Sequence, residues 1–566
     1  MNADLVFPIL FQVLGGLGIF LLGMKHMSEG MQAVAGSRLR KMISAVTDKR
    51  ILACLIGTLI TGIVQSSSVT TVMVVGFVNS GIMTLMQAIG VIFGANIGTT
   101  ITGWILVLKI GKYGLPILGV AAFFFLFSKK ERLRYIGMTI MGIGMVFFGL
   151  ELMKNGFKPL RGLPEFSAWF HAFQATSYLG IIKCAAVGCV LTMIVQSSSA
   201  TLGITIGLAS TGVIEFQTAA ALVMGENIGT TITAWLASLG TTTTAKRAAY
   251  AHVLFNVLGT CWFIALFPIA IKALSALIGA RTGYNPLEIG IDDVDETKFG
   301  MIITAGIALT HTTFNVTNVV IFLPFAGLLG KFVSKVVPEK AAEEAPQLTY
   351  LDVRMLDTPS VGIVQSQRQI NLMAESVENM MELLKTCLES EGIHAKEESQ
   401  IFQREEVLDN VQKEVFLFLS NLVSGQVPHD ITHKAHMQMR IADEYESLSD
   451  YISNVLKGII KMRDNEMSLS VEGRTELLGL HELVSNYIQD INEAGRIENE
   501  GIIEKAQIDG DLITRQMKDY RRLHLIRLSE KKVPALKSLV YTDQLNAYRR
   551  MKDHALNIAE VIAGEK

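Results

Sequence analysis

Residues 64–70 read VQSSSVT, and residues 195–201 read VQSSSAT. Each stretch places a glutamine and three serines inside a segment that is otherwise almost entirely apolar. Because a polar side chain in apolar surroundings needs a hydrogen-bond partner, one such stretch could be a packing patch or a binding feature. Two matching copies predict a polar structure that is built twice into one apolar domain.

The composition of the 566-residue chain changes sharply along its length. Half of all residues are hydrophobic, 18% are charged, and the net charge is −2. Residues 1–332 consist of apolar runs, most of them long enough to cross a ~30 Å hydrocarbon core. After a predicted linker at 333–356, residues 357–566 are charged and periodic. The pattern predicts an all-α chain with a membrane domain followed by a soluble domain.

Basic residues indicate how the membrane domain is oriented. They cluster in alternate loops, at 38–50, 128–134 and 246–247, and such loops face the cytoplasm. We therefore expect the N-terminus outside and the C-terminal domain in the cytoplasm of a bacterial plasma membrane. No basic residue precedes the first apolar run, so no cleaved signal peptide is expected. The expected crossings lie near 6–24, 85–108, 115–127, 135–152, 216–239, 248–271 and 299–329.

The two QSSS stretches belong to an internal repeat. GANIGTTITGW begins at Gly94 and GENIGTTITAW at Gly225, which is the same offset of 131 residues that separates the QSSS copies. An earlier pair is weaker: GLGIFLLGMKHMSEGM from Gly16 resembles GIGMVFFGLELMKNGF from Gly142. The repeats are expected at about 6–134 and 135–271, with the last helix at 299–329 outside them.

The crossing count predicts that the second repeat is inverted. Three expected crossings separate the QSSS copies, and an odd number turns the second copy upside down. The segments flanking each QSSS are about half a span long at ~1.5 Å per residue, which predicts re-entrant hairpins. Inverted repeats whose broken helices meet near the midplane are typical of secondary transporters. The flanking segments are 51–64 with 69–80, and 182–195 with 200–212.

The missing charges restrict what the QSSS stretches can bind. Residues 51–108 contain no Asp, Glu, Lys, Arg or His, and residues 184–245 contain only Glu215 and Glu226 as charged residues. A helix N-terminus supplies only about half a positive charge, so an anion bound here would need accompanying cations. Composition favours small hard cations, such as sodium, with or without an anion. The alternative is that these small polar residues only mediate helix packing.

Further polar residues lie in apolar segments beside the hairpins. Each NIGTT is expected to be an unwound turn whose oxygens bind an ion, through Asn96, Thr99, Thr100, Asn227, Thr230 and Thr231. Glu226, which matches Ala95 in the first copy, could be a cation ligand, a proton carrier or a hydrogen-bonding link between helices. Two matched pairs, His252 with Asn256 and His311 with Asn315, could line the pathway or hold helices together.

The paired QSSS and NIGTT motifs, with AHVLFN at 251–256 and THTTFN at 310–315, resemble the type II sodium/phosphate cotransporter family over residues 1–332. The resemblance implies inorganic phosphate as substrate, sodium as driving ion and a site shared by both QSSS copies. Animal members typically have Ser where this chain has Glu226, so stoichiometry and charge movement are not carried over. The site residues implied are Gln65, Ser66, Ser67, Ser68, Gln196, Ser197, Ser198 and Ser199.

The C-terminal region has the periodicity of two three-helix bundles. RIADEYESLSDYI at 440–452 and MKDHALNIAEVI at 551–562 resemble the PhoU family of regulators of phosphate uptake, whose acidic motifs can bind metal. The resemblance implies a divalent or transition metal at Asp443, Glu446 and Asp450, which share a helical face. An ordinary solvated acidic face is the alternative. The helices are expected at 360–391, 396–424, 430–463, 469–503, 509–530 and 533–562.

These features predict a secondary transporter that couples sodium to inorganic phosphate within a lipid bilayer, with the soluble domain sensing or gating. An exporter would use the same site, and a non-transporting phosphate receptor is the competing class. No Walker A lysine, HExxH or GxSxG motif is present, so we expect no enzyme. A homo-oligomer and a cytoplasmic regulatory partner stay open, and no nucleic acid is expected.

Overall fold

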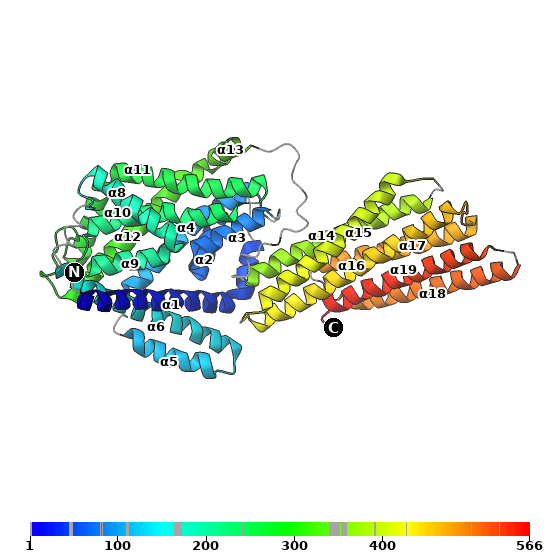
Figure 1. The fold of residues 1–566 in the computed structure, drawn as a ribbon, viewed down its shortest axis with the longest axis horizontal. Coiled ribbons are helices and arrows are strands. Elements are labelled where there is room, and N and C mark those ends of the chain that lie inside the picture. Colours follow the sequence, from blue (N-terminus) through cyan, green and yellow to red (C-terminus); the bar gives the residue numbers. More distant parts are fainter. Residues whose placement is uncertain are drawn as a thin grey trace. The chain divides into compact units, whose positions relative to one another are not determined.

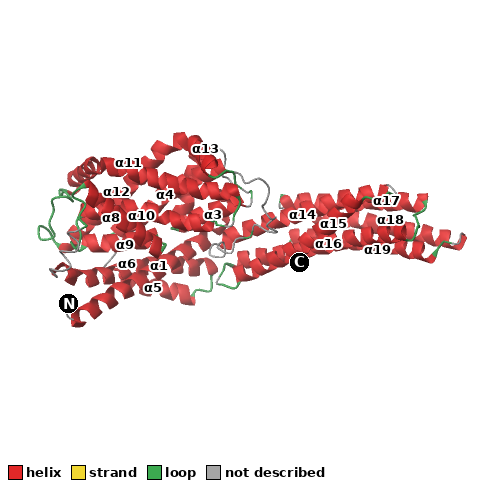
Figure 2. Cartoon of the chain, turned by 45° about the horizontal axis from the view of Figure 1, so that its top comes forward, coloured by secondary structure: helices red, strands yellow, loops and turns green. Residues whose placement is uncertain are grey.

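The structure, a computed structural model, forms two compact units, Met1–Glu343 and Glu344–Lys566. Within the residues that it describes, every regular element is a helix and none is a strand (Figure 2). Most of the predicted linker, residues 339–350 and 352–356, lies outside the described residues, as do the side chains of Arg38, Arg40 and Lys41. The described residues are 3–44, 49–79, 81, 83–108, 113–162, 173–239, 241–338, 351, 359–389, 392–425, 427–497, 499, 501–530 and 533–565.

The first unit is a bundle of apolar helices (Figure 1). Its first half contains α1 (Ala3–Ser44), α2 (Arg50–Val64), α3 (Ser67–Asn79), α4 (Leu85–Val107), α5 (Gly114–Phe127), α6 (Glu131–Phe157) and the short η2 (Lys158–Gly162). Its second half contains α8 (Tyr178–Val195), α9 (Ser198–Ser210), α10 (Phe216–Ala237), α11 (Thr243–Thr282), α12 (Glu296–Phe322), η3 (Leu323–Phe325) and α13 (Ala326–Val336).

The first unit has the surface of a multi-pass membrane protein. Within the described ranges, six helical segments are long and apolar enough to cross a bilayer. Large apolar side chains cover the outside, and Phe11, Phe127, Ile194 and Ile269 are between 68% and 74% exposed. An apolar surface of this extent would be unstable in water and suits lipid contact.

Glycines hold the paired helices of each repeat at backbone contact. A β-carbon at Gly94 of α4 would lie 1.9 Å from the carbonyl oxygen of Cys54 on α2. In the second repeat, a β-carbon at Gly225 of α10 would lie 1.7 Å from the carbonyl oxygen of Ala185 on α8. Gly225 and Ala185 lie 131 positions after Gly94 and Cys54, so the duplication seen in the sequence is also present in the helix packing. The same offset relates Gly57–Val91 to Gly188–Leu222, and Gly98–Thr58 to Gly229–Cys189.

The weaker sequence pair, in α1 and α6, also packs through glycines. A β-carbon at Gly16 would lie 2.8 Å from the carbonyl oxygen of Gly149, and one at Gly23 would lie 2.8 Å from that of Gly142. Residue numbers rise along α1 as they fall along α6, so the two helices run antiparallel. Figure 1 shows them side by side along their length.

Two predicted lengths differ from the structure. The first arm of the second hairpin was predicted as the half-span 182–195, but α8 begins at Tyr178 and has 18 residues. The reason is the N-cap at Ser177, whose hydroxyl accepts a hydrogen bond from the amide of Gly180. The expected crossing at 115–127 corresponds to α5, which has 14 residues, fewer than the ~20 of a full span. Since the odd crossing count includes α5, inversion of the repeats stays a prediction.

The second unit consists of six amphipathic helices in two sets of three. Their bounds agree closely with the predicted ones, except that the fourth helix ends, and the fifth begins, seven residues earlier than expected. The first set contains α14 (Pro359–Glu389), α15 (Ala395–Val423) and α16 (His429–Asp464). The second set contains α17 (Val471–Arg496), α18 (Ile502–Glu530) and α19 (Ala535–Ile562). The sets meet where α16 packs on α19 and α14 packs on α17.

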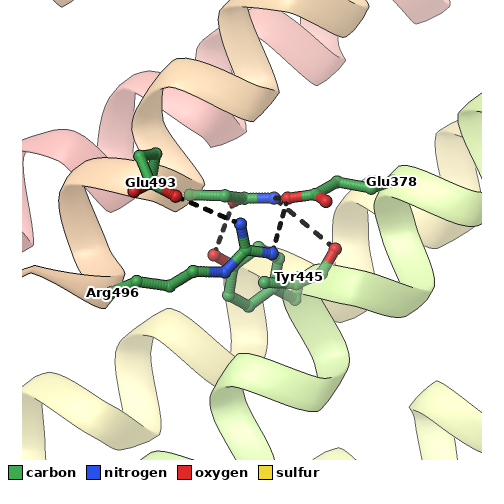
Figure 3. A network of polar contacts seen from close by, with 6 residues as sticks. Glu378, Tyr445, Glu493 and Arg496 are labelled. Atoms are coloured by element: carbon green, nitrogen blue, oxygen red, sulfur yellow. Dashed lines mark hydrogen bonds and ion pairs between the residues drawn. The ribbon is translucent and has the colours of Figure 1, made fainter.

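A buried polar network fixes how the two sets meet (Figure 3). The hydroxyl of Tyr445 on α16 donates to the carboxamide oxygen of Asn492 on α17 at 2.7 Å. Asn492 in turn donates to the carboxylate of Glu378 on α14 at 2.7 Å, and Arg496 donates to the same oxygen at 3.0 Å. Burial raises the pKa of Tyr445. These bonds are satisfied in only one alignment of the three helices.

We expect Gly225→Ala to lower the thermal unfolding temperature of the detergent-solubilised protein by several degrees. The new methyl group must push α8 away from α10, and overpacking of this kind costs at least ~1–3 kcal/mol. Gly18→Ala is the matched control, because a β-carbon there meets no atom within 4 Å. An unfolding temperature for Gly225→Ala equal to that of the control would contradict the close approach.

We expect Asn492→Ala to destabilise the chain by about 1–3 kcal/mol, because it leaves the buried hydroxyl of Tyr445 unpaired. The measurement is thermal unfolding followed by circular dichroism. Asn410→Ala serves as control, since the Asn410 side chain bonds the carbonyl of Glu406 in its own helix. Equal stability of the two variants would show that the network does not join the sets.

Candidate functional site

Each QSSS begins with a glutamine in a left-handed conformation. Gln65 ends α2 with φ 55°, and Gln196 ends α8 with φ 56°. Their amides bond the carbonyls of Thr61 and Thr192 at 2.7 and 2.8 Å. Glycine normally occupies such a position, and another residue costs roughly 1–2 kcal/mol. In the described chain, Glu466 is the only further non-glycine residue with positive φ. Strain repeated at matching positions points to function.

The three serines of each copy open the following helix. Ser66 and Ser197 cap it, because their hydroxyls accept from the amides of Val69 at 3.2 Å and Ala200 at 3.3 Å. Among the described residues, the remaining serine hydroxyls have no hydrogen-bond partner. The two QSSS tips, residues 65–68 and 196–199, therefore present free hydroxyls beside the unbonded amides of a helix N-terminus. These serines are Ser67, Ser68, Ser198 and Ser199.

The two tips differ in how they are closed. Gln65 is 5% exposed, and its carboxamide oxygen accepts from the hydroxyl of Thr102 on α4 at 3.1 Å. Gln196 is exposed, and its carboxamide has no partner in the described chain. The counterpart of Thr102 is Thr233, which instead bonds the carbonyl of Thr230 in its own helix at 2.9 Å. The first tip is closed onto α4, while the second is open.

The NIGTT segments are helical, so the prediction of unwound turns is wrong. Asn96 lies in α4 and donates to the carbonyl of Ile92 at 2.9 Å, and Asn227 in α10 donates to Val223 at 2.8 Å. Their threonines likewise bond carbonyls of their own helices, so these side chains support the helix instead of interrupting it. The glycines of these segments, Gly98 and Gly229, allow α4 to pack closely against α2 and α10 against α8. The threonines are Thr99, Thr100, Thr230 and Thr231.

The two histidine–asparagine pairs lie buried on α11 and α12. Asn256 and Asn315 donate to the carbonyls of His252 and His311, one turn earlier in the same helix. Both ring nitrogens of His252 and one of His311 have no partner among the described residues. These pairs therefore do not link the two helices through the hydrogen bonds that the structure contains.

Asn318, which the sequence motifs did not indicate, links α11 and α12. Its carboxamide accepts from the indole of Trp262 at 3.0 Å and donates to the carbonyl of Phe255 at 3.3 Å. The available signal was its position, three residues after the HxxFN motif and in a buried helix. The HxxFN motif thus lies on the helix that makes the link, but Asn318, and not His311 or Asn315, forms the hydrogen bonds to α11.

Glu226 is a buried carboxyl group in the centre of α10. It is 2% exposed and accepts a hydrogen bond from the hydroxyl of Thr205 on α9 at 2.9 Å. The sequence pointed to Glu226 but not to Thr205, because their contact depends on the packing of α9 against α10.

A cavity in the first unit does not include these residues. It has a volume of about 600 Å³, lies between α5 and α6, and is lined by side chains such as Tyr113, Phe124 and Ile140. Its lining is almost wholly apolar, so it offers no group to orient an ion.

In the second unit, the predicted metal residues lie on α16. Burial, followed by the charges of Asp450 and Asp443, raises the pKa of Glu446. Gln412 donates to Asp443 at 3.0 Å. Among the described residues, no group of three or more His, Cys, Asp or Glu side chains is arranged to hold a metal ion, so metal binding here stays a prediction.

The chain is similar to known transport proteins. A family profile described as "Na+/Pi-cotransporter" matches residues 19–155 and 164–279, and each range contains one QSSS and one NIGTT. A Salmonella typhimurium protein named "Putative inorganic phosphate export protein YjbB" is 24% identical, over 94% of this chain and 92% of its own length.

Two further relatives match parts of the chain. The Bacillus subtilis "Uncharacterized protein YqeW" is 30% identical over 57% of this chain and 96% of its own length. The human "Sodium-dependent phosphate transport protein 2B" is 39% identical over 101 residues, which are 18% of this chain and 15% of the human protein. No solved structure matches.

We expect Thr102→Val to lower the free energy of unfolding by about 1–3 kcal/mol, because the buried carboxamide oxygen of Gln65 loses its donor. The measurement is thermal unfolding in detergent. Thr233→Val is the matched control, since Thr233 occupies the same position in the second repeat but donates to the carbonyl of Thr230 and not to Gln196. Equal stability of the two variants would refute the difference between the tips.

Proposed function

Because the chain belongs to the Na+/Pi-cotransporter family, we propose that it carries inorganic phosphate through a bacterial plasma membrane together with sodium ions. The protein is a multi-pass membrane protein of a transporter family, not an enzyme. The observation that carries the proposal is the pair of QSSS tips, each with a strained glutamine and with serine hydroxyls that have no hydrogen-bond partner in the described chain. Such hydroxyls and amides can hold phosphate oxygens, while hydroxyl and carboxamide oxygens suit sodium.

Electrostatics supports sodium as the accompanying ion. The helices that carry the tips, α2, α3 and α9, have no charged residue after Arg50, and Lys183 of α8 is exposed. The tip-bearing helices themselves therefore offer phosphate no buried cationic side chain in the described chain. A helix N-terminus supplies about half a charge, and an unneutralised anion in low dielectric is costly. Co-bound sodium ions offset that cost, which is the physical basis of coupling.

An inverted arrangement is supported by α1 and α6. These helices carry the matched segments from Gly16 and Gly142, and they run antiparallel. Antiparallel counterparts are what a two-fold axis in the membrane plane produces. In this proposal the two tips approach the midplane from opposite faces. The closed first tip and the open second tip then correspond to access from one side of the membrane only.

The second unit is proposed to be a PhoU-like regulator in the cytoplasm that senses phosphate status or gates transport. Its two sets of three helices fit that role. The acidic face at Asp443, Glu446 and Asp450 is the proposed place for a divalent or transition metal. A homo-oligomer and a cytoplasmic regulatory partner are compatible with this arrangement.

Export is the second candidate function. A relative that is aligned over 94% of this chain carries the words phosphate export in its name, and an exporter would use the same tips. Radiolabelled phosphate loaded inside or outside proteoliposomes distinguishes the two directions. Phosphate binding without net flux in either direction would identify a receptor.

We expect Ser67→Ala and Ser198→Ala each to reduce sodium-driven phosphate flux in proteoliposomes at least tenfold, because each removes an unpaired hydroxyl from a tip. Replacing sodium by potassium should abolish the wild-type flux. Ser210→Ala, a buried serine on α9 outside the motif, is the control and should retain flux. Normal sodium and phosphate affinities in both tip variants would disprove this placement of the site.

A further inference from the structure

The two repeats also differ at a buried contact between α9 and α10. In the second repeat, Thr205 of α9 donates to Glu226 of α10 at 2.9 Å. Residues 131 positions earlier are Val74 of α3 and Ala95 of α4, both with no exposed surface. An apolar pair in one repeat is therefore replaced by a hydroxyl and a carboxyl group in the other. Since the equivalent residues of the first repeat are apolar, this pair of helices does not need a polar link at that position.

No cationic side chain balances Glu226. Within the described ranges it has no ion pair, and no charged group acts on it. A buried carboxylate without a counter-ion is costly, so the group takes up a proton or a metal cation.

The helices packed against α10 are α3, α8, α9, α11 and α12. Neither α3 nor α9 carries a titratable side chain. α8 carries the exposed Tyr178 and Lys183, the buried Cys184 and the partly buried Cys189. α11 carries the buried His252. Its other titratable residues are Lys246, Arg247 and Tyr250 nearer its start, and Cys261, Lys272 and Arg281 further along. α12 carries the buried His311, with Glu296 and Lys298 at its start. Glu226 is therefore the one carboxyl group buried among these helices in the described chain.

The contacts of Glu226 favour a proton over a metal cation. Hard metal cations gather several oxygen ligands, whereas the described residues bring a single side-chain oxygen, that of Thr205, to hydrogen-bond distance of this carboxylate. That hydroxyl points its proton at the carboxylate, which is the wrong direction for sharing a cation. A carboxyl group with one donor and no further ligands is instead suited to exchange a proton with water.

We propose that Glu226 binds a proton from water on one side of the membrane and releases it on the other, so that phosphate movement is coupled to protons as well as sodium. The O–H bond forms on the carboxylate when the site faces one side and breaks when it faces the other, with no change of oxidation state. The neutral acid lets the site reorient without a buried charge. The inference rests on the proposed function, and it assigns the proton to the second repeat alone.

The test measures radiolabelled phosphate and internal pH together in proteoliposomes, at fixed sodium gradient. We expect wild-type protein to move about one more proton per phosphate than Glu226→Gln, which removes the titration but keeps the shape. The double variant Thr205→Val/Glu226→Ala, which gives the second repeat the pair of the first, should show the same loss. Glu215→Gln is the control, because Glu215 is an exposed carboxylate at the start of the same helix.

The outcomes separate the two proposals. Wild-type protein without phosphate flux overturns the proposed function. Wild-type flux with the same proton-to-phosphate ratio in Glu226→Gln and in the double variant overturns the proton role alone. If the variants do not transport, infrared difference spectra of wild type and Glu226→Gln decide whether Glu226 takes up a proton. A protonated carboxyl band that titrates in wild type and is missing from the variant supports the inference; identical spectra overturn it.

Discussion

The close approach of α2 to α4, and of α8 to α10, is the constraint on which both QSSS tips depend. Glycines place these backbones closer than any side chain would allow. The positions of α2 and α8 are thereby fixed along α4 and α10. Because the end of each of these helices cannot shift against its neighbour, it can keep a glutamine in a left-handed conformation. Packing in the helices thus sustains strain at the tips.

A duplicated framework does not make the two tips equivalent. Thr102 closes the first tip by bonding Gln65, whereas its counterpart Thr233 bonds its own helix. The Thr205–Glu226 contact likewise has an apolar counterpart. These differences are single side chains on a shared backbone. Identical repeats would give the proposed transporter no way to assign a proton to one of them.

The second unit uses a different principle. Its helices are amphipathic, and its core is held by apolar packing with a few buried polar contacts, such as the one joining Glu378, Tyr445 and Asn492. In water, apolar burial supplies most of the stability and polar networks select one alignment. In the apolar surroundings of the first unit, helix contact depends on glycine-mediated fit instead. Each unit shows the packing that its solvent requires.

The sequence by itself determined the helical class, the duplication, the position of the polar residues and the helices of the second unit, such as that predicted at 430–463 and observed at His429–Asp464. Local periodicity encodes all of these. It could not reveal that NIGTT stays helical. The same Asn and Thr residues can bond carbonyls of their own helix or bind an ion, and the sequence does not distinguish these two uses. Only the tertiary structure paired Thr102 with Gln65 and Thr205 with Glu226, residues 37 and 21 positions apart. Those contacts depend on which helices meet and at what register, and that is decided by packing across the whole unit.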